Sequence, residues 1–491
     1  MKEQSVVTEL RRKIFAEVSR VAYESEAENI ADDIEAIPYK ITPTEKPQYR
    51  ESIYRERAIA SERVRLAMGM SLRPQDRPVH ITSGLSASNI AEQYYEPPLM
   101  QVIPSACEKC AVNDYKVSGE CVRCMARSCE TVCPVDAVFI GDGGRAEINK
   151  YRCIRCGRCK AACPYEAIIH KVRPCAKACG VDAVESDTLG RASINPRKCV
   201  ACGQCMVNCP FGAIADKSQI FQLIRALKRG DKIVAEVAPA IIGQFGQASL
   251  GQMRSALKKL GFSEVFEVAV GADISAMEDA EKYASDIATG REPFLLTSCC
   301  PSWRMLAKRQ FPELRERVSG TLTPMTLAAK SIKEKMPHAR VVFIGPCAAK
   351  KLEAMRSSVR GEVDFVITFE ELAGIFETRG IDPTACEEAD TTEGATAAGR
   401  GYAVAGGVAS AVESCLKAIH PEIQMKMERV ESLSECKKML ILAAHGKKNG
   451  YLIEGMACPG GCVAGAGVNL PVNKGRAAVN DYVKNTKRKI P

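Results

Sequence analysis

Apolar residues recur at helical spacing at the start of the chain. One face of the expected helix carries Val6, Leu10, Ile14, Val18 and Val21, which are three or four residues apart. A charged stretch at residues 51–68 continues the helical pattern, and the proline-rich residues 96–104 are typical of a linker. We therefore predict a helical N-terminal region with a linker over residues 1–105, with a packing or interaction role and no chemistry of its own.

The pattern changes to alternating strands and helices in the C-terminal half. We expect a helix at residues 217–229 and then a buried strand at residues 232–240 that Pro239 ends. Further strands are expected at residues 266–270, 294–297, 341–344 and 365–368, with helices around residues 277–284, from Pro301 and from Glu370. This alternation predicts an α/β domain with parallel or mixed sheets over residues 217–491. Ligands usually bind such sheets past the carboxyl ends of the strands.

Cysteine usage adds metal chemistry to this picture. The 491 residues include 24 cysteines, many of them in C-x2-C and C-x3-C-P groups, which favours metal thiolates in a reducing compartment over disulfides. The N-terminus lacks the apolar core of a signal peptide, and no apolar run reaches the roughly 18 residues of a membrane span. We expect a soluble cytoplasmic protein without membrane contact.

The formal net charge of +9 gives little support for nucleic-acid binding. Charged residues are interspersed and aromatic residues make up only 5%, so no basic stripe with interleaved aromatics is present. Clusters held by four thiolates would also add negative charge and bring the assembled protein near neutrality. We expect no nucleic-acid partner, although a local basic patch could dock an acidic electron carrier.

Sixteen of the cysteines lie between residues 107 and 209. The runs that start at Cys153 and Cys199 have the spacing C-x2-C-x2-C-x3-C-P, which matches the bacterial ferredoxin pattern for a 4Fe-4S cluster. A run that starts at Cys121, C-x2-C-x4-C-x3-C-P, is a looser variant. Zinc is the alternative for such cysteines, but the C-x3-C-P step followed by a small apolar strand favours ferredoxin-like α+β modules.

The remaining four cysteines indicate how this region is built. Residues 133–153 and 179–199 repeat one unit, in which Val-Asp-Ala-Val and Ile-Asn stand at the same places between two cysteines. The second copy lacks its opening C-x2-C, while Cys107 and Cys110 are unclaimed upstream. We therefore predict a ferredoxin-like region at residues 106–216, in which a module at residues 121–163 is nested inside a second module made of residues 107–110 and 175–209.

In two-cluster ferredoxins the fourth cysteine of each run ligates the other cluster. The four expected sets are then Cys121, Cys124, Cys129 with Cys163; Cys153, Cys156, Cys159 with Cys133; Cys107, Cys110, Cys175 with Cys209; and Cys199, Cys202, Cys205 with Cys179. A rival arrangement pairs the run at Cys153 directly with the run at Cys199. Either arrangement predicts about four 4Fe-4S clusters that act as a chain of one-electron sites.

Three short stretches in the C-terminal half carry the strongest functional signal. They are Thr297 to Trp303 (TSCCPSW), Ile344 to Glu353 (IGPCAAKKLE) and Glu454 to Gly467 (EGMACPGGCVAGAG). In sequence, order and spacing they resemble the signature stretches of the iron-only (FeFe) hydrogenases, and the resemblance covers roughly residues 233–467. It implies the fold of that family's catalytic domain, with ferredoxin-like modules before it.

The resemblance also implies a cofactor and its ligands. The cofactor is the H-cluster, a 4Fe-4S cubane joined to a di-iron subcluster that carries CO, CN and a bridging dithiolate. Cys300, Cys347, Cys458 and Cys462 would ligate the cubane, with Cys462 bridging to the di-iron subcluster. Cys299 would stay free and relay protons, because a thiol can donate and accept them when its environment allows.

Further residues are implied around the di-iron subcluster. Lys350 would hydrogen-bond a cyanide, Pro239 and Ala240 would line the same side, and Met456 would pack against the subcluster. The chain departs from the best-studied branch of the family in having Ala240 for Ser, Met325 for Gln, Gly345 for Met, and Ala466 within a glycine triplet. These departures remove a polar cyanide partner and alter the packing.

The implied proton route is altered as well. By alignment, Asp279 takes the place of the first relay glutamate and Ser319 that of the relay serine, whereas Lys282 occupies the position of the second glutamate. A carboxylate, a hydroxyl and a thiol can still pass a proton between them.

We therefore expect a hydrogenase that interconverts protons and electrons with hydrogen. Electrons would enter through the N-terminal clusters from a ferredoxin-type carrier, and the cofactor implies an anaerobic host with H-cluster maturation enzymes. Two alternatives are a hydrogen sensor of the same family and a non-catalytic iron–sulfur scaffold protein. The retained Cys299 favours catalysis over the scaffold.

Overall fold

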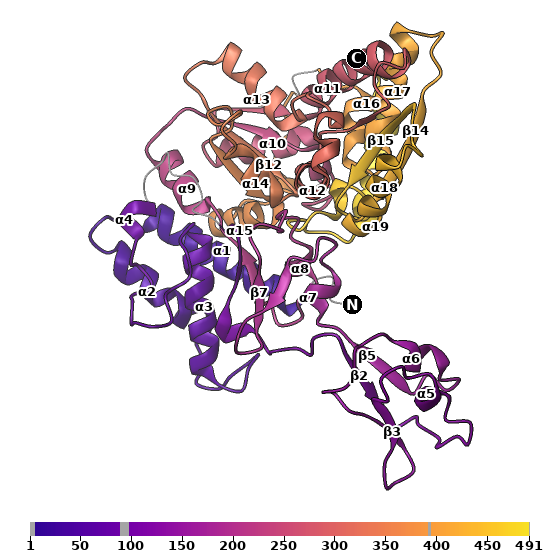
Figure 1. Cartoon of the computed structure of the whole chain (residues 1–491). Coiled ribbons are helices and arrows are strands. Elements are labelled where there is room, and N and C mark those ends of the chain that lie inside the picture. The colour runs from indigo at the N-terminus through magenta and orange to yellow at the C-terminus, as the bar shows by residue number, and fades with distance from the viewer. Residues whose placement is uncertain (1–4, 89–97, 391–393, 491) are drawn as a thin grey trace.

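The computed structural model describes residues 5–88, 98–390 and 394–490. Helices of the N-terminal region lie beside a ferredoxin-like region, and the C-terminal half forms the largest body (Figure 1). Among the described residues, none of the helices has the length and apolar character that crossing a membrane requires.

The described residues of the N-terminal region form four helices, as the sequence pattern predicts. They are α1 (Val6–Glu24), α2 (Ile30–Ile41), α3 (Ile53–Ala67) and α4 (Leu85–Ser88). Ser5 caps α1 by accepting a hydrogen bond from the backbone N–H of Thr8. The apolar face of α1 packs against α15 (Phe369–Arg379) and α9 (Ile220–Lys228), so these helices share one core with the C-terminal half.

The linker prediction is wrong for the described part of residues 96–104. Residues 98–104 include β1 (Met100–Val102), which pairs antiparallel with β8 (Ile214–Asp216), and Met100 and Ile103 are buried. Residues 96 and 97 lie outside the described residues. The prolines that suggested a linker flank this short edge strand, where a missing N–H donor is tolerated.

In the ferredoxin-like region, one pair of strands lies in sequence between the two strands of another pair, and the predicted module bounds stay a prediction. The inner module is framed by β2 (Asp114–Val117) and β5 (Ile168–Lys171), which pair antiparallel, and it lies in sequence between the paired strands β1 and β8. Its remaining elements are α5 (Ser128–Thr131), β3 (Val138–Ile140), β4 (Ala146–Ile148) and α6 (Arg158–Ala162). The outer module contains α7 (Pro174–Lys177), β6 (Val184–Ser186), β7 (Ala192–Ile194) and α8 (Gln204–Val207). Figure 1 shows the inner module projecting away from the rest of the chain.

Two parallel sheets form the framework of the C-terminal domain. The first has the order β10-β9-β12-β13, from β9 (Ile233–Val237), β10 (Glu264–Glu267), β12 (Arg340–Gly345) and β13 (Phe365–Thr368). The second has the order β11-β15-β14, from β11 (Phe294–Leu296), β14 (Lys426–Glu431) and β15 (Tyr451–Met456). The α/β prediction is confirmed, and its strands are divided between two sheets.

Helices cover both sheets. Besides α9 and α15 they are α10 (Leu250–Lys259), α11 (Ala269–Lys282), α12 (Pro301–Gln310), α13 (Pro324–Lys335), α14 (Ala349–Ala354), α16 (Ala397–Arg400), α17 (Gly407–Ile419), α18 (Leu433–Ala444) and α19 (Val472–Asn485). The predicted strand at residues 266–270 ends at Glu267, and α11 begins at Ala269 instead of near residue 277. Small residues let this early turn of α11 pack directly against α13.

Candidate metal centre

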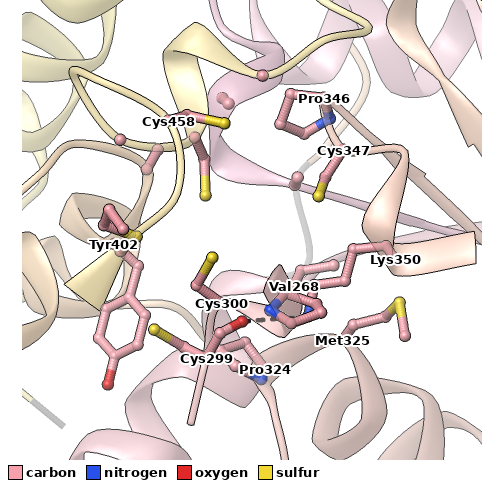
Figure 2. A pocket seen from close by; sticks show the side chains of 18 of the residues that line it. Val268, Cys299, Cys300, Pro324, Met325, Pro346, Cys347, Lys350, Tyr402 and Cys458 are labelled. Carbon is pink, nitrogen blue, oxygen red and sulfur yellow. Dashed lines mark hydrogen bonds between the residues drawn. The ribbon is translucent and has the colours of Figure 1, made fainter. Parts of the chain in front are cut away.

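A buried cavity lies at the carboxyl ends of the strands of both sheets. Cys300, Cys347, Cys458 and Cys462 all line it. Cys300 follows β11, Cys347 follows β12, and the other two follow β15. Figure 2 shows the sulfur atoms of the three labelled cysteines of this set, Cys300, Cys347 and Cys458, around a common space. The structure thus brings together the four thiols that the resemblance selected, from three separate stretches.

Local structure explains how these thiols reach the cavity. Cys300 is the N-cap of α12, and Pro301 occupies the first helical position, where its missing N–H costs nothing. Burial raises the pKa of Cys300, and backbone N–H groups of Trp303 and Ala457 act in the opposite direction. Burial also raises the pKa of Cys347 to about 11 and that of Cys462 to about 12. Such thiols need a metal to hold them as thiolates, because a bound metal deprotonates its thiol ligands.

Cys299 lines the same cavity next to the four candidate ligands. Burial raises the pKa of its thiol well above the ordinary range, and the neighbouring Cys300 adds to this effect. The backbone of this segment is anchored because the Ser298 hydroxyl donates to the carbonyl of Thr321 at 2.8 Å. Cys299 is therefore a fifth thiol held against the cavity.

Lys350 is a buried cation that also lines the cavity. Its Nζ donates to Glu353 Oε2 at 2.8 Å, to Thr323 Oγ1 at 3.1 Å and to the carbonyl of Cys299 at 3.4 Å. Burial lowers the pKa of Lys350, but Glu353 outweighs it and the net pKa is raised. The Thr323 hydroxyl in turn donates to Glu353 Oε1 at 2.6 Å. The ammonium is therefore kept charged and oriented at the cavity wall.

The other residues implied by the resemblance also reach the cavity. Pro239 and Ala240 line it from the turn after β9, Met325 lines it from the first turn of α13, and Met456 lines it from the end of β15. Sequence reasoning did not select Tyr402, which lines the same cavity. Tyr402 stands outside the three signature stretches, so no local motif marked it.

Asp279 and Ser319 form a buried, hydrogen-bonded pair of a carboxylate and a hydroxyl. The Ser319 hydroxyl donates to Asp279 Oδ1 at 2.6 Å and accepts from the backbone N–H of Thr321 at 3.1 Å. Both Asp279 and Ser319 are buried, and burial raises the pKa of Asp279 to about 6. The third predicted relay position, Lys282, is partly exposed and lies 4.0 Å from Asp286 in a surface ion pair. The structure therefore joins Asp279 with Ser319 and leaves Lys282 at the surface.

A second cavity is lined by Cys107, Cys110, Cys175 and Cys209, which is one of the four sets predicted from nesting. Burial, with Cys209 as the strongest neighbouring thiol, raises the pKa of Cys175 to about 11. The side chains of this set come from both sides of the inserted inner module. Their convergence agrees with the nested arrangement, although the assignment of ligands to clusters stays a prediction.

Elsewhere in the ferredoxin-like region, the thiols that raise the pKa of a cysteine can be compared with the predicted ligand sets. After burial, the thiols that raise the pKa of Cys159 are Cys153, Cys133 and Cys156. The pKa of Cys129 is raised by burial and then by Cys163 and Cys124. The pKa of Cys202 is raised to about 12, first by burial and then by Cys179, Cys199 and Cys300.

Cys202 connects the accessory region with the main cavity. It lines that cavity, and the side-chain amide of the nearby Gln204 donates to Cys458 Sγ at 3.7 Å. The Ser302 hydroxyl on α12 donates to the carbonyl of Val200 at 2.9 Å, which fixes the two regions together. The cysteine set of Cys199, Cys202, Cys205 and Cys179 is thus the set that adjoins the main cavity.

The donor chemistry of the cysteine sets suits iron–sulfur clusters. Each set supplies four soft thiolates, which is the ligand set of a 4Fe-4S cluster. Within the described residues, no three or more His, Cys, Asp or Glu side chains are placed to hold one metal ion.

The family model for the iron-only hydrogenase large subunit, C-terminal domain, matches residues 231–466. Residues 231–466 belong to the iron-only hydrogenase family. Models for a 4Fe-4S dicluster domain and a 4Fe-4S binding domain match residues 113–164 and 192–215. The hydrogenase match thus contains most residues that line the main cavity, and the dicluster match contains both cysteine runs of the inner module, residues 121–163.

Among curated relatives, the chain is similar to the NADP-reducing hydrogenase subunit HndD of Solidesulfovibrio fructosivorans, with 30% identity over 306 residues. The match covers 50% of this chain and 52% of that protein. The chain is 28% identical over 303 residues to iron hydrogenase 1 of Clostridium pasteurianum, covering 52% and 53%. The chain spans about half the length of these two relatives. It is also 24% identical over 332 residues to protein NAR1 of Arabidopsis thaliana, covering 52% and 69%.

A solved structure of an FeFe-hydrogenase from Chlamydomonas reinhardtii matches with 24% identity and a TM-score of 0.44, covering 55% of this chain and 91% of that chain.

Proposed function

We propose that this hydrogenase-family protein interconverts hydrogen with two protons and two electrons. The observation that carries the proposal is the convergence of Cys300, Cys347, Cys458 and Cys462 on one buried cavity, with Cys299 left over beside them. This is the donor set that an H-cluster requires, and soft thiolates are the ligands that suit its irons. When bound there, the six-iron cofactor would supply the redox chemistry and the hydrogen-binding site.

The protein would supply ligands, orientation and proton transfer. In the proposal Cys300, Cys347, Cys458 and Cys462 hold the cubane, and Lys350 donates to a cyanide from its position on the cavity wall. Pro239, Ala240, Met325 and Met456 exclude water around the cofactor. Cys299 exchanges protons with the cofactor, and the hydrogen-bonded pair Asp279 and Ser319 connects Cys299 toward the surface.

Electrons would travel through the accessory clusters. The set that contains Cys202 adjoins the main cavity, and its member Cys205 lies near Cys175 of the second cavity. The inner module would receive electrons first, because it projects outward and Cys156 is exposed there. Exposed basic residues surround this cysteine, namely Arg152, Arg155, Arg158 and Lys160. This arrangement supports an acidic, ferredoxin-type carrier as the partner.

Infrared spectroscopy of protein matured under anaerobic conditions tests the cofactor. The expected result is a set of CO and CN stretching bands, together with about sixteen irons in accessory clusters beyond six in the active centre. Protein that contains only 4Fe-4S clusters and shows no such bands would contradict the hydrogenase proposal.

Cys299→Ala tests the proton route. We expect hydrogen evolution to fall about a hundredfold or more, because positioned acid–base groups contribute at least this much, while the CO and CN bands persist. Cys415→Ala is the matched control, since Cys415 is a buried thiol on α17 that does not line the cavity. Full activity in the Cys299 variant would remove the proposed route.

The relatives that include NAR1 support a second candidate, a non-catalytic iron–sulfur protein. In that case the matured chain would lack the CO and CN bands and would not evolve hydrogen. A hydrogen sensor would show the bands with slow turnover. The same spectroscopic and kinetic measurements therefore separate the three functions.

A further inference from the structure

Tyr402 is a buried phenol at the edge of the main cavity. It lies in the short 3-10 turn Gly401–Ala403 between α16 and α17, and only 6% of it is exposed. Its hydroxyl has no hydrogen-bond partner among the described residues. Figure 2 shows its ring beside Cys299, with the hydroxyl pointing away from the space between the labelled ligand cysteines.

The surroundings of Tyr402 link the two parts of the proposed proton route. Burial raises the pKa of Tyr402, and the charges of Asp279 and then Cys299 raise it further, whereas Ser275 lowers it. Ser275 and Asp279 lie one turn apart on α11 and are both buried. Tyr402 also packs in one cluster with Ala276 and Ala280 of α11, on either side of Asp279 in sequence, and with Cys299. It therefore adjoins both parts of the proposed route.

The turn that carries Tyr402 is held in place by buried contacts. Glu454 accepts hydrogen bonds from the backbone N–H of Gly406 at 2.7 Å and of Ala409 at 2.8 Å. Gly407 packs so tightly on this turn that a Cβ would come 1.9 Å from the carbonyl oxygen of Gly401. The position of the phenol is thus determined by the fold and does not depend on its own hydroxyl.

A phenylalanine would fill this space as well as a tyrosine does. Burying a hydroxyl without a protein partner is unfavourable, so packing gives no reason for the oxygen. A hydroxyl can accept one proton while it donates another, which a phenyl ring cannot do. The unpartnered oxygen between a carboxylate and a thiol therefore calls for a role in proton transfer.

We propose that the Tyr402 hydroxyl relays protons between Cys299 and the hydrogen-bonded pair of Asp279 and Ser319. The inference rests on the proposed function. In one transfer, a lone pair of the oxygen accepts a proton from the Asp279 side while the original phenolic proton leaves toward Cys299. The phenol stays neutral, no electrons move, and rotation of the hydroxyl resets it. Ordered water fills the gaps that are too long for direct contact.

Tyr402→Phe in the full-length matured protein tests the relay. We expect hydrogen evolution to fall at least tenfold and its solvent deuterium isotope effect to rise, with CO and CN bands unchanged. Tyr283→Phe is the matched control, because Tyr283 is equally buried but its hydroxyl donates to the carbonyl of Gly450, away from the cavity. The control is expected to keep wild-type turnover and isotope effect.

A second measurement uses protein with its 4Fe-4S clusters but prepared without the di-iron subcluster. Its infrared difference spectrum on acidification contains the carboxyl band of Asp279, which Asp279→Asn identifies. Tyr402→Phe should shift this band or its titration midpoint, because it removes a polar hydroxyl that interacts electrostatically with Asp279. Tyr283→Phe should leave both unchanged.

The outcomes separate the two proposals. Wild-type protein without CO and CN bands or hydrogen turnover would overturn the proposed function and, with it, the catalytic relay. Normal bands and turnover in wild type and Tyr402→Phe, with the same isotope effect and carboxyl band, would overturn the relay alone.

Discussion

At the scale of single residues, the site contains ionisable groups whose charged form is disfavoured by burial. Asp279 is 1% exposed, and burial raises its pKa from 3.8 to about 6, although Ser319 donates to it. A carboxyl that titrates near neutral pH can both accept and release protons, which suits a relay better than a carboxylate that is always ionised. The same shift means that ionising Asp279 in the folded protein costs stability.

Asp279→Asn should reveal this cost. The pKa of Asp279 is higher in the folded than in the unfolded protein. Its contribution to the stability of the fold is therefore least unfavourable below pH 4 and becomes fully unfavourable above about pH 6. Replacement by the neutral amide should therefore stabilise the protein by about 1 kcal/mol more at pH 8 than at pH 5. Thermal unfolding at the two pH values measures the difference.

Glu278→Gln is the control for this measurement, because Glu278 is the adjacent but exposed acid on α11. Its effect on stability should be small and similar at both pH values. An equal stabilisation by Asp279→Asn at pH 5 and pH 8 would contradict the raised pKa.

At the scale of elements, the site depends on the close approach of α11 and α13. Gly271 on α11 faces the start of α13, and a Cβ there would lie 2.2 Å from the carbonyl oxygen of Pro324 and 2.8 Å from the backbone nitrogen of Ala328. The next residue after Pro324 is Met325, which lines the main cavity. This helix pair therefore places part of the cavity wall and the carboxylate of Asp279 together.

Gly271→Ala should push the two helices apart. We expect a loss of about 1–3 kcal/mol in the free energy of unfolding, the range for overpacking a well-packed site. Denaturant unfolding measures it, and Gly143→Ala serves as the control because a Cβ there meets nothing within 4 Å. Wild-type stability in the Gly271 variant would show that the helices can separate without cost.

At the scale of the whole molecule, the N-terminal helices are part of the hydrogenase-domain core. Arg11 on α1 pairs with Glu370 on α15 at 2.6 Å, and both side chains are buried. The Thr378 hydroxyl of α15 donates to the carbonyl of Ala16 at 2.7 Å. Helix α1 therefore packs against α9 and α15 of the C-terminal half, and the role of residues 1–105 stays a prediction.

Arg11→Met should destabilise the hydrogenase domain itself. It leaves the buried Glu370 without its closest cation, and breaking a buried pair in this way costs about 3–5 kcal/mol. Calorimetry should show the main transition moving to lower temperature. The control is Lys13→Met, which removes only an exposed ion pair with Glu9 on the same helix and should cost less than about 1 kcal/mol. A separate early transition for the N-terminal helices would contradict the shared core.

The sequence by itself determined the features that are written in short stretches. The resemblance of three short stretches indicated the family and the four thiols of the main cavity, and the repeat at residues 133–153 and 179–199 predicted the nesting. The strand at residues 365–368 and the helix from Pro301 are confirmed as well. Local motifs carry this information because metal ligation and helix starts depend on neighbours a few residues apart.

Only the tertiary structure decided how distant segments meet. It places Cys202 at the main cavity, joins Asp279 with Ser319, and brings in Tyr402, which no motif marked. It also builds a second sheet from β11, β14 and β15 and turns residues 98–104 from an expected linker into an edge of the outer module. Such contacts depend on packing between elements that are separated in sequence, by 40 residues for Asp279 and Ser319, and packing leaves no periodic pattern along the chain.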